Sequence, residues 1–146
     1  MAKKLTYKLG DVFEFDLDEG GKGYGRVLKI EQPSVFIELF KIAPNNPVEL
    51  SELEKSERIL SIWSVDTGLK KGLWRVIGNI PVLGEVKMPT FWKRDAFDCN
   101  KIILIRGDES FEVSQDEIGN AQPYGIFGHD AVRIRYVHEL KQRGIL

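Results

Sequence analysis

The sequence predicts an α+β fold that is mainly antiparallel β: a twisted sheet or partly open barrel of about six to eight short strands. A C-terminal helix and one or two short helical turns complete the prediction. The first observation behind it is that Phe13, Phe15 and Leu17 alternate with acidic residues, as in a half-buried strand. The second is the glycine-rich turn at 20–23, which returns the chain into another strand and so predicts a hairpin. A small SH3-like or OB-like barrel is the alternative arrangement.

The segment after this hairpin predicts a central strand and a short helix. Residues 35–42 are apolar on both faces except at Glu38 and Lys41, which is typical of a strand buried inside a sheet. Ser51 and Glu54 have the spacing of a capping box, with Ser51 as the N-cap of a helix of one or two turns.

Four further strand signals follow along the chain. The apolar run 59–65 predicts one strand, and alternation over 74–80 predicts another. A strand is expected to begin at 91–92, after the second of two prolines that disfavour a mid-sheet position. The wholly apolar run 102–105 predicts a buried strand that ends at Arg106.

The segment 130–143 fits both a strand, by alternation, and a helix, by an apolar face at helical spacing. We favour the helix. Asp130 is a suitable N-cap, and Gly144 follows as a stop signal.

Composition limits the class of protein. A chain of 146 residues fits a single domain over 1–146, and 42% hydrophobic with 29% charged residues is ordinary for a soluble globular protein. The net charge of −1 argues against a nucleic-acid partner. With no signal-peptide core and no membrane-length apolar run, we expect no membrane partner and a cytoplasmic location. Cys99 is the only cysteine, and we expect it to be inert and largely buried.

The sequence offers little for catalysis. His129 and His138 are the only histidines, and they form neither a metal-ligand motif nor a recognisable acid–base pair. We therefore expect no enzyme activity, no metal and no cofactor. The tryptophans at 63, 74 and 92 suit base stacking, but large aromatics in strands more often belong to the core. Arg26 fits a recognition residue or an edge cation equally well.

Charge is unevenly placed along the chain, in two segments that contain acids and no lysine or arginine. A solvated loop is the ordinary explanation, and an acidic patch that attracts a basic protein is the functional one. The candidate partner-binding residues from the two segments are Asp16, Asp18, Glu19, Asp108, Glu109, Glu112, Asp116 and Glu117.

The opening hairpin and a later tryptophan segment carry a resemblance to a known family. The matching positions are Gly10, Asp11, Val12 and Phe13, then Tyr24, Gly25, Arg26 and Val27, then Trp74, the run 78–81 and Trp92. Over roughly the first hundred residues the chain resembles the bacterial polymorphic-toxin immunity proteins of family twenty-six.

The resemblance implies a cognate antitoxin that binds a secreted toxin domain, often a nuclease, and neutralises it by stoichiometric occlusion. The toxin is expected to be basic, which agrees with the acidic segments, and the immunity protein to be a monomer or weak dimer. The matching positions would hold the fold while other loops choose the partner. A β-barrel module that binds nucleic acid or peptide is the alternative, and a small enzyme is a further class.

Overall fold

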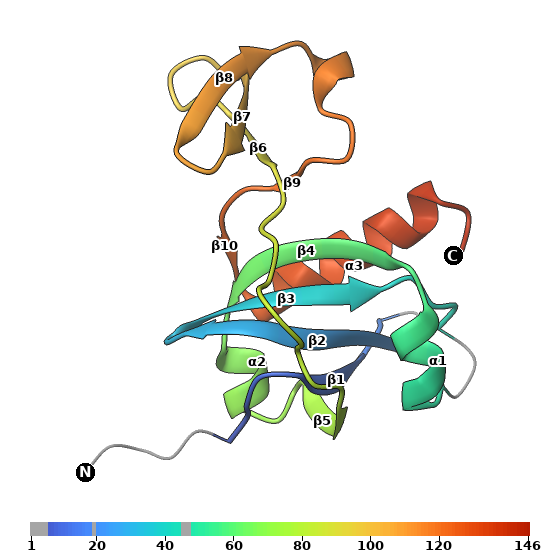
Figure 1. Cartoon of the computed structure of the whole chain (residues 1–146). Coiled ribbons are helices and arrows are strands. Elements are labelled where there is room, and N and C mark those ends of the chain that lie inside the picture. Colours follow the sequence, from blue (N-terminus) through green and yellow to red (C-terminus); the bar gives the residue numbers. More distant parts are fainter. Residues whose placement is uncertain (1–5, 19, 45–47) are drawn as a thin grey trace.

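The computed structural model describes residues 6–18, 20–44 and 48–146, and it contains two β-sheets and one long helix (Figure 1). The larger sheet has the order β10-β4-β3-β2-β1-β5 and the smaller one β8-β7-β6-β9. The larger sheet consists of β1 (Asp11–Asp16), β2 (Lys22–Glu31), β3 (Ser34–Phe40), β4 (Arg58–Val65), β5 (Arg75–Asn79) and β10 (Ile126–Phe127). The smaller sheet consists of β6 (Phe91–Arg94), β7 (Ile102–Arg106), β8 (Glu109–Val113) and β9 (Gln122–Pro123). The helices are α1 (Leu50–Lys55), α2 (Thr67–Lys70), the 3-10 turn η1 (Gln115–Glu117) and α3 (His129–Gln142).

This architecture confirms the predicted fold class: most strand pairs are antiparallel, and both sheets are open. The described strands do not close a barrel, because β10 and β5 lie at opposite ends of the larger sheet. The predicted single sheet is divided into two, since β6 to β9 pair among themselves. In Figure 1 the smaller sheet projects from the larger one and is joined to it by extended chain.

The first hairpin is held by phenylalanine rings that lie over glycines. In the β1–β2 pairing Phe13 is opposite Gly25, and Phe15 is opposite Gly23. A Cβ atom on Gly25 would overlap the Phe13 ring and lie 2.7 Å from Leu39 Cδ2. The ring therefore occupies the space that a side chain would need, which is why glycine stands inside this strand.

Helix α3 covers one face of the larger sheet and confirms the helical prediction for the tail. Its apolar face presents Val132, Tyr136 and Leu140, all fully buried in the main hydrophobic core. The Tyr136 hydroxyl donates a hydrogen bond of 2.8 Å to the Phe40 carbonyl, and burial raises the pKa of this tyrosine. The helix is thus anchored to β3 by packing and by one buried polar contact.

The ends of α3 correct one prediction and confirm another. The helix begins at His129 with Gly128 as N-cap, so Asp130 lies in the first turn, where it pairs with Arg133 at 3.1 Å. The stop at Gly144 is confirmed, because this glycine has a φ of +72° and Ile145 N donates to the Leu140 carbonyl.

The opposite face of the larger sheet is covered by α1 and by the extended segment between β5 and β6, which crosses in front of the sheet in Figure 1.

The predicted capping box at Ser51 is wrong. The helix begins at Leu50 with Glu49 as N-cap and no side-chain cap, since Leu50 and the fully buried Leu53 pack into the core on this face. Phe91 joins the smaller sheet to this face through an edge-to-face contact with Phe36 at 6.5 Å.

A buried ionic cluster ties three neighbouring strands together. Glu38 on the central strand β3 is 8% exposed, and its Oε1 lies 3.1 Å from Arg26 Nε and 3.2 Å from Arg58 Nε. Arg26 is directly opposite Glu38 in the β2–β3 pairing. A lone carboxylate here would be strongly unfavourable, and the two guanidinium groups compensate for its burial.

Within the described ranges, no helix is both long enough and apolar enough to span a membrane.

We expect Gly25→Ala to lower the free energy of unfolding by about 1–3 kcal/mol, because the new methyl group must displace the Phe13 ring. Urea unfolding measures this loss. Gly128→Ser is the matched control: nothing lies within 4 Å of a Cβ there, and serine suits an N-cap. Equal stability of the two variants would contradict the packing argument.

We expect Glu38→Ala to cost about 3–5 kcal/mol of unfolding free energy, because it leaves Arg26 and Arg58 without their shared carboxylate. The control is Glu57→Ala, which removes an exposed pair with Lys41 and should change stability by less than about 1 kcal/mol. Chemical denaturation of both variants at neutral pH provides the comparison. A small effect at Glu38 would mean that solvent reaches the cluster.

Candidate partner-binding surfaces

Most of the residues that carried the family resemblance have structural contacts, and the first landmark contacts the 78–81 run directly. Gly10 has a φ of +84°, its N–H donates to the Val27 carbonyl at 2.8 Å, and its carbonyl accepts from Ile80 N at 2.9 Å. The buried Asp11 carboxylate accepts from Asn79 Nδ2 at 3.0 Å. The first landmark of the resemblance and the 78–81 run are therefore hydrogen-bonded to each other across β1 and β5.

Most of the remaining landmarks also lie in the interior, but Trp92 on β6 is only half-buried. Tyr24 is buried and Trp74 stacks on the Phe13 ring at 4.6 Å, while Arg26 belongs to the ionic cluster with Glu38. Arg26 lies on the interior strand β2, so it is not an edge cation. Its side chain is only 14% exposed, which leaves little of it for a partner to contact.

The N-terminal acids are engaged by cations of this chain. Asp16 Oδ1 lies 2.6 Å from Lys22 Nζ and 3.0 Å from Arg75 Nη2. Hydrogen bonds from these two groups hold the pKa of Asp16 below its usual range. Asp18 lies 3.5 Å from Arg133 on α3. Glu19, the third candidate of this segment, lies outside the described residues.

The C-terminal acids occupy the outer margin of the smaller sheet. Asp108 and Glu109 lie at the β7–β8 turn, Glu112 lies on the edge strand β8, and Asp116 lies in η1. All four are exposed, and none has an ion-pair partner among the residues that the structure describes. Their negative charge is therefore available to a partner.

Glu117 differs from the other four because it has a structural contact. Its carboxylate accepts hydrogen bonds from the Ser114 N–H at 3.1 Å and hydroxyl at 2.8 Å, which lowers its pKa. This is a capping box that sequence reasoning did not identify.

We call the five residues Asp108, Glu109, Glu112, Asp116 and Glu117 the acidic edge. The acidic edge follows β8 and continues into η1, and β8 lies far from β1 in Figure 1, so the structure does not bring the two acidic segments together.

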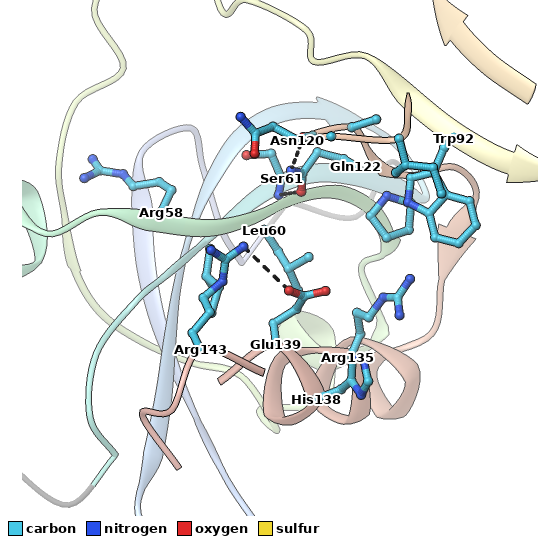
Figure 2. A pocket seen from close by; sticks show the side chains of 15 residues that line it. Arg58, Leu60, Ser61, Trp92, Asn120, Gln122, Arg135, His138, Glu139 and Arg143 are labelled. Atoms are coloured by element: carbon cyan, nitrogen blue, oxygen red, sulfur yellow. Dashed lines mark hydrogen bonds and ion pairs between the residues drawn. The ribbon is translucent and has the colours of Figure 1, made fainter. Parts of the chain in front are cut away.

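A groove of about 440 Å³ runs between the outer edge of β4 at 58–61, the C-terminal part of α3 and the segment 118–123 (Figure 2). Arg135 comes from α3, Arg143 is the C-cap of this helix, Arg58 comes from β4, and Trp92 of β6 lies beside the loop. Within the groove lining Glu139 is the only acidic residue. We call this feature the arginine groove.

The wall of the arginine groove that residues 118–123 form is fixed by hydrogen bonds. Gln122 accepts from Ser61 N at 2.8 Å through Oε1, and its Nε2 donates to the Asn120 carbonyl at 3.1 Å. Across from this wall, the Arg135 guanidinium lies over the Trp92 ring, 5.9 Å from the ring centroid. The groove is therefore shaped before any partner arrives.

Sequence reasoning missed this groove. The only available signal was the polar face of the predicted helix, where Arg135, His138 and Glu139 recur at helical spacing. Arg58 and Trp92 reach the groove from elements far away in the chain, and no local pattern connects them with α3.

The tryptophans take different positions. Trp74 is 3% exposed in the core, Trp63 is half-buried beside Phe36, and the half-buried Trp92 lines the arginine groove. The three rings therefore form no shared stacking platform.

The residues suspected of chemistry are dispersed. His129 lies at the start of α3 with Nε2 3.6 Å from Asp130, and His138 lies in the arginine groove. The prediction of a buried thiol is wrong: Cys99 is exposed, in the turn between β6 and β7. Over the described ranges, no three histidine, cysteine or acidic side chains are grouped so that they could hold a metal ion.

The geometry therefore defines an open-sheet α+β domain whose prominent surfaces are an acidic edge and an arginine groove. Comparison with known families supplies the class: the sequence model of Immunity protein 26 matches residues 8–103, about two thirds of the chain. The chain belongs to this family of immunity proteins. Neither a curated protein nor a solved structure gives a significant match. The matched residues include all the resemblance landmarks, while the acidic edge and the α3 side of the groove lie beyond them.

Proposed function

We propose that this protein binds a cognate toxin domain and neutralises it by stoichiometric occlusion of its active site or substrate groove. Membership of an immunity-protein family supports toxin neutralisation as the function. Members of such families act by binding and not by turnover, and the dispersed histidines of this chain agree with that mechanism. The protein works as a monomer or weak dimer.

The carboxylates of the acidic edge support a more specific proposal about the partner, because they form no ion pair with other described residues. A toxin that cleaves nucleic acid needs a basic surface for its polyanionic substrate. The acidic edge offers complementary charge to such a surface, and like the substrate it would attract the toxin from a distance. We therefore propose that the partner is a basic nuclease domain and that it approaches through the smaller sheet.

The two acidic segments have different roles in this proposal. The carboxylates of Asp16 and Asp18 are engaged by Lys22, Arg75 and Arg133 of the same chain, so they contribute less to an external field. They form at most the periphery of the interface. The acidic edge forms the part that attracts the toxin.

The arginine groove is the one observation that favours the alternative, a module that binds nucleic acid. Arginine and a neighbouring tryptophan suit both phosphates and unstacked bases. The acidic edge opposes it, because Asp116 and Glu117 come directly before the loop that forms the groove wall. A polyanion in the groove would have to pass close to these carboxylates.

Stoichiometric occlusion predicts a linear titration. With the cognate toxin domain, toxin activity should fall in proportion to the added protein and reach its floor at a fixed molar ratio. The endpoint should stay constant with incubation time. An endpoint that moves to lower ratios as incubation lengthens would show that one molecule inactivates many toxins, and the binding mechanism would be wrong.

Charge reversal tests the acidic edge. We expect Glu112→Lys with Asp116→Lys to slow association with the toxin by about tenfold or more, with a smaller effect on dissociation, because exposed charges mainly steer encounter. Added salt should slow association of the wild type in the same way. Glu117 is left intact because it caps η1.

The matched control for this test is Glu52→Lys with Glu54→Lys on α1, which reverses the same amount of exposed charge elsewhere. Association rates by stopped flow separate the two variants. Equal slowing in both pairs, or an association rate that does not respond to salt, would mean that the acidic edge only keeps a sheet margin solvated.

A further inference from the structure

The arginine groove contains one guanidinium group, that of Arg135, to which the proposal about the acidic edge assigns no role. Of its guanidinium groups, that of Arg58 is committed to Glu38 and to the carbonyls of Glu54 and Ser56. Arg143 is paired with Glu139 at 3.6 Å. Arg135 has no ion-pair partner among the described residues, and its recorded contact is the Trp92 ring.

Trp92 makes Arg135 a prepared anion site. The guanidinium group lies 5.9 Å from the ring centroid, within the range of a cation–π attraction that favours this position of the long side chain. The planar N–H fork of arginine matches the two oxygens of a carboxylate, which allows a bidentate contact. Figure 2 shows Arg135 and Trp92 side by side at one end of the groove.

The groove has room for a short protein segment and little more. Its volume of about 440 Å³ is shared between the β4 edge, α3 and the loop wall. The side-chain amide of Gln122 is already held by hydrogen bonds with Ser61 N and with the main-chain carbonyl of Asn120, which fixes this wall. Among the arginines of the lining, Arg135 remains for a ligand, beside the apolar surface of Trp92.

The neighbourhood of the groove distinguishes an acidic protein segment from a nucleic acid. The acidic edge ends at Glu117, and the groove wall begins at the next residue, Ile118. A chain of phosphates would be repelled there, whereas a partner with a basic surface and one projecting acid would satisfy both features. Specific interfaces commonly combine steering charges at the rim with a few well-enclosed anchors.

We propose that the arginine groove receives an aspartate or glutamate side chain, carried on a loop of the toxin, whose carboxylate binds Arg135. This inference rests on the proposed function. It assigns different tasks to the two surfaces: the acidic edge accelerates encounter, and Arg135 slows departure. The two therefore affect different rate constants.

The test measures binding of the full chain to a catalytically inactive form of the toxin domain. We expect Arg135→Glu to raise the dissociation rate at least about tenfold and to change the association rate less, because truncating a close interfacial charge pair acts mainly on dissociation. Arg135→Gln should show a smaller rise. Lys71→Glu, at the exposed C-cap that follows α2, is the control and should bind like the wild type.

Folding does not confound this variant. Arg135 makes no ion pair within the part of the chain that the structure describes, in contrast to Arg58 and Arg143, so its replacement leaves no buried carboxylate alone. Thermal unfolding of Arg135→Glu should match that of the wild type within a few degrees.

A photo-crosslinking residue in place of the exposed His138 identifies what enters the groove. We expect the crosslinked toxin peptide to contain an acid, and its replacement by glutamine to cause the same loss as Arg135→Gln. In a double-mutant cycle, combining the two changes should add little further loss. Additive losses would overturn the proposed pairing.

The remaining outcomes are distinguishable. If the wild type binds and neutralises the toxin while Arg135→Glu dissociates like Lys71→Glu, the groove proposal is wrong and the function stands. If the wild type does not bind the toxin at all, the function fails and the groove proposal with it. Anisotropy with a labelled single-stranded oligonucleotide tests the other ligand class: binding that Arg135→Glu abolishes would overturn an acidic protein occupant.

Discussion

The packing of Phe13 over Gly25 is the constraint on which the larger sheet depends. Because the glycine has no side chain, the ring can lie flat against β2, and its other side is free for the stacked indole of Trp74 at 4.6 Å. Phe15 lies over Gly23 in the same way and meets the Tyr136 ring edge-on at 5.4 Å. Gly23 therefore makes room for the Phe15 and Tyr136 rings through which α3 packs on the sheet, and Gly25 makes room for the Phe13–Trp74 stack.

The first hairpin and the C-terminal helix could be predicted because their signals are local. Alternation of Phe13, Phe15 and Leu17 marks a strand at any place in a fold, and an apolar helical face followed by Gly144 marks a helix end. The start of α1 could not be predicted in the same way, because burial of Leu50 outweighed a good N-cap residue at Ser51. Tertiary packing decided that boundary.

The candidate surfaces were only partly accessible to sequence reasoning. Runs of acids are visible in one dimension, but which of them are neutralised depends on Arg75 and Arg133, which are distant in the chain. The arginine groove was invisible for the same reason, since Arg58, Trp92 and Arg135 meet only after folding. The resemblance landmarks gave the family correctly, and two of them, Gly10 with Asp11 and the run 78–81, are hydrogen-bonded to each other across β1 and β5.

The smaller sheet leaves and re-enters the rest of the molecule at neighbouring points. Phe91, its first strand residue, pairs with Gln122 on β9, so the two ends of the excursion lie on adjacent strands. Such an insertion can be exchanged as a cassette without changing the connectivity of the host sheet, provided that the Phe91 contact with Phe36 is kept. One recombination event would replace the acidic edge and one wall of the groove together. If these surfaces bind the toxin as proposed, such an exchange would change the toxin specificity in a single step, while the glycine–phenylalanine scaffold stays unaltered.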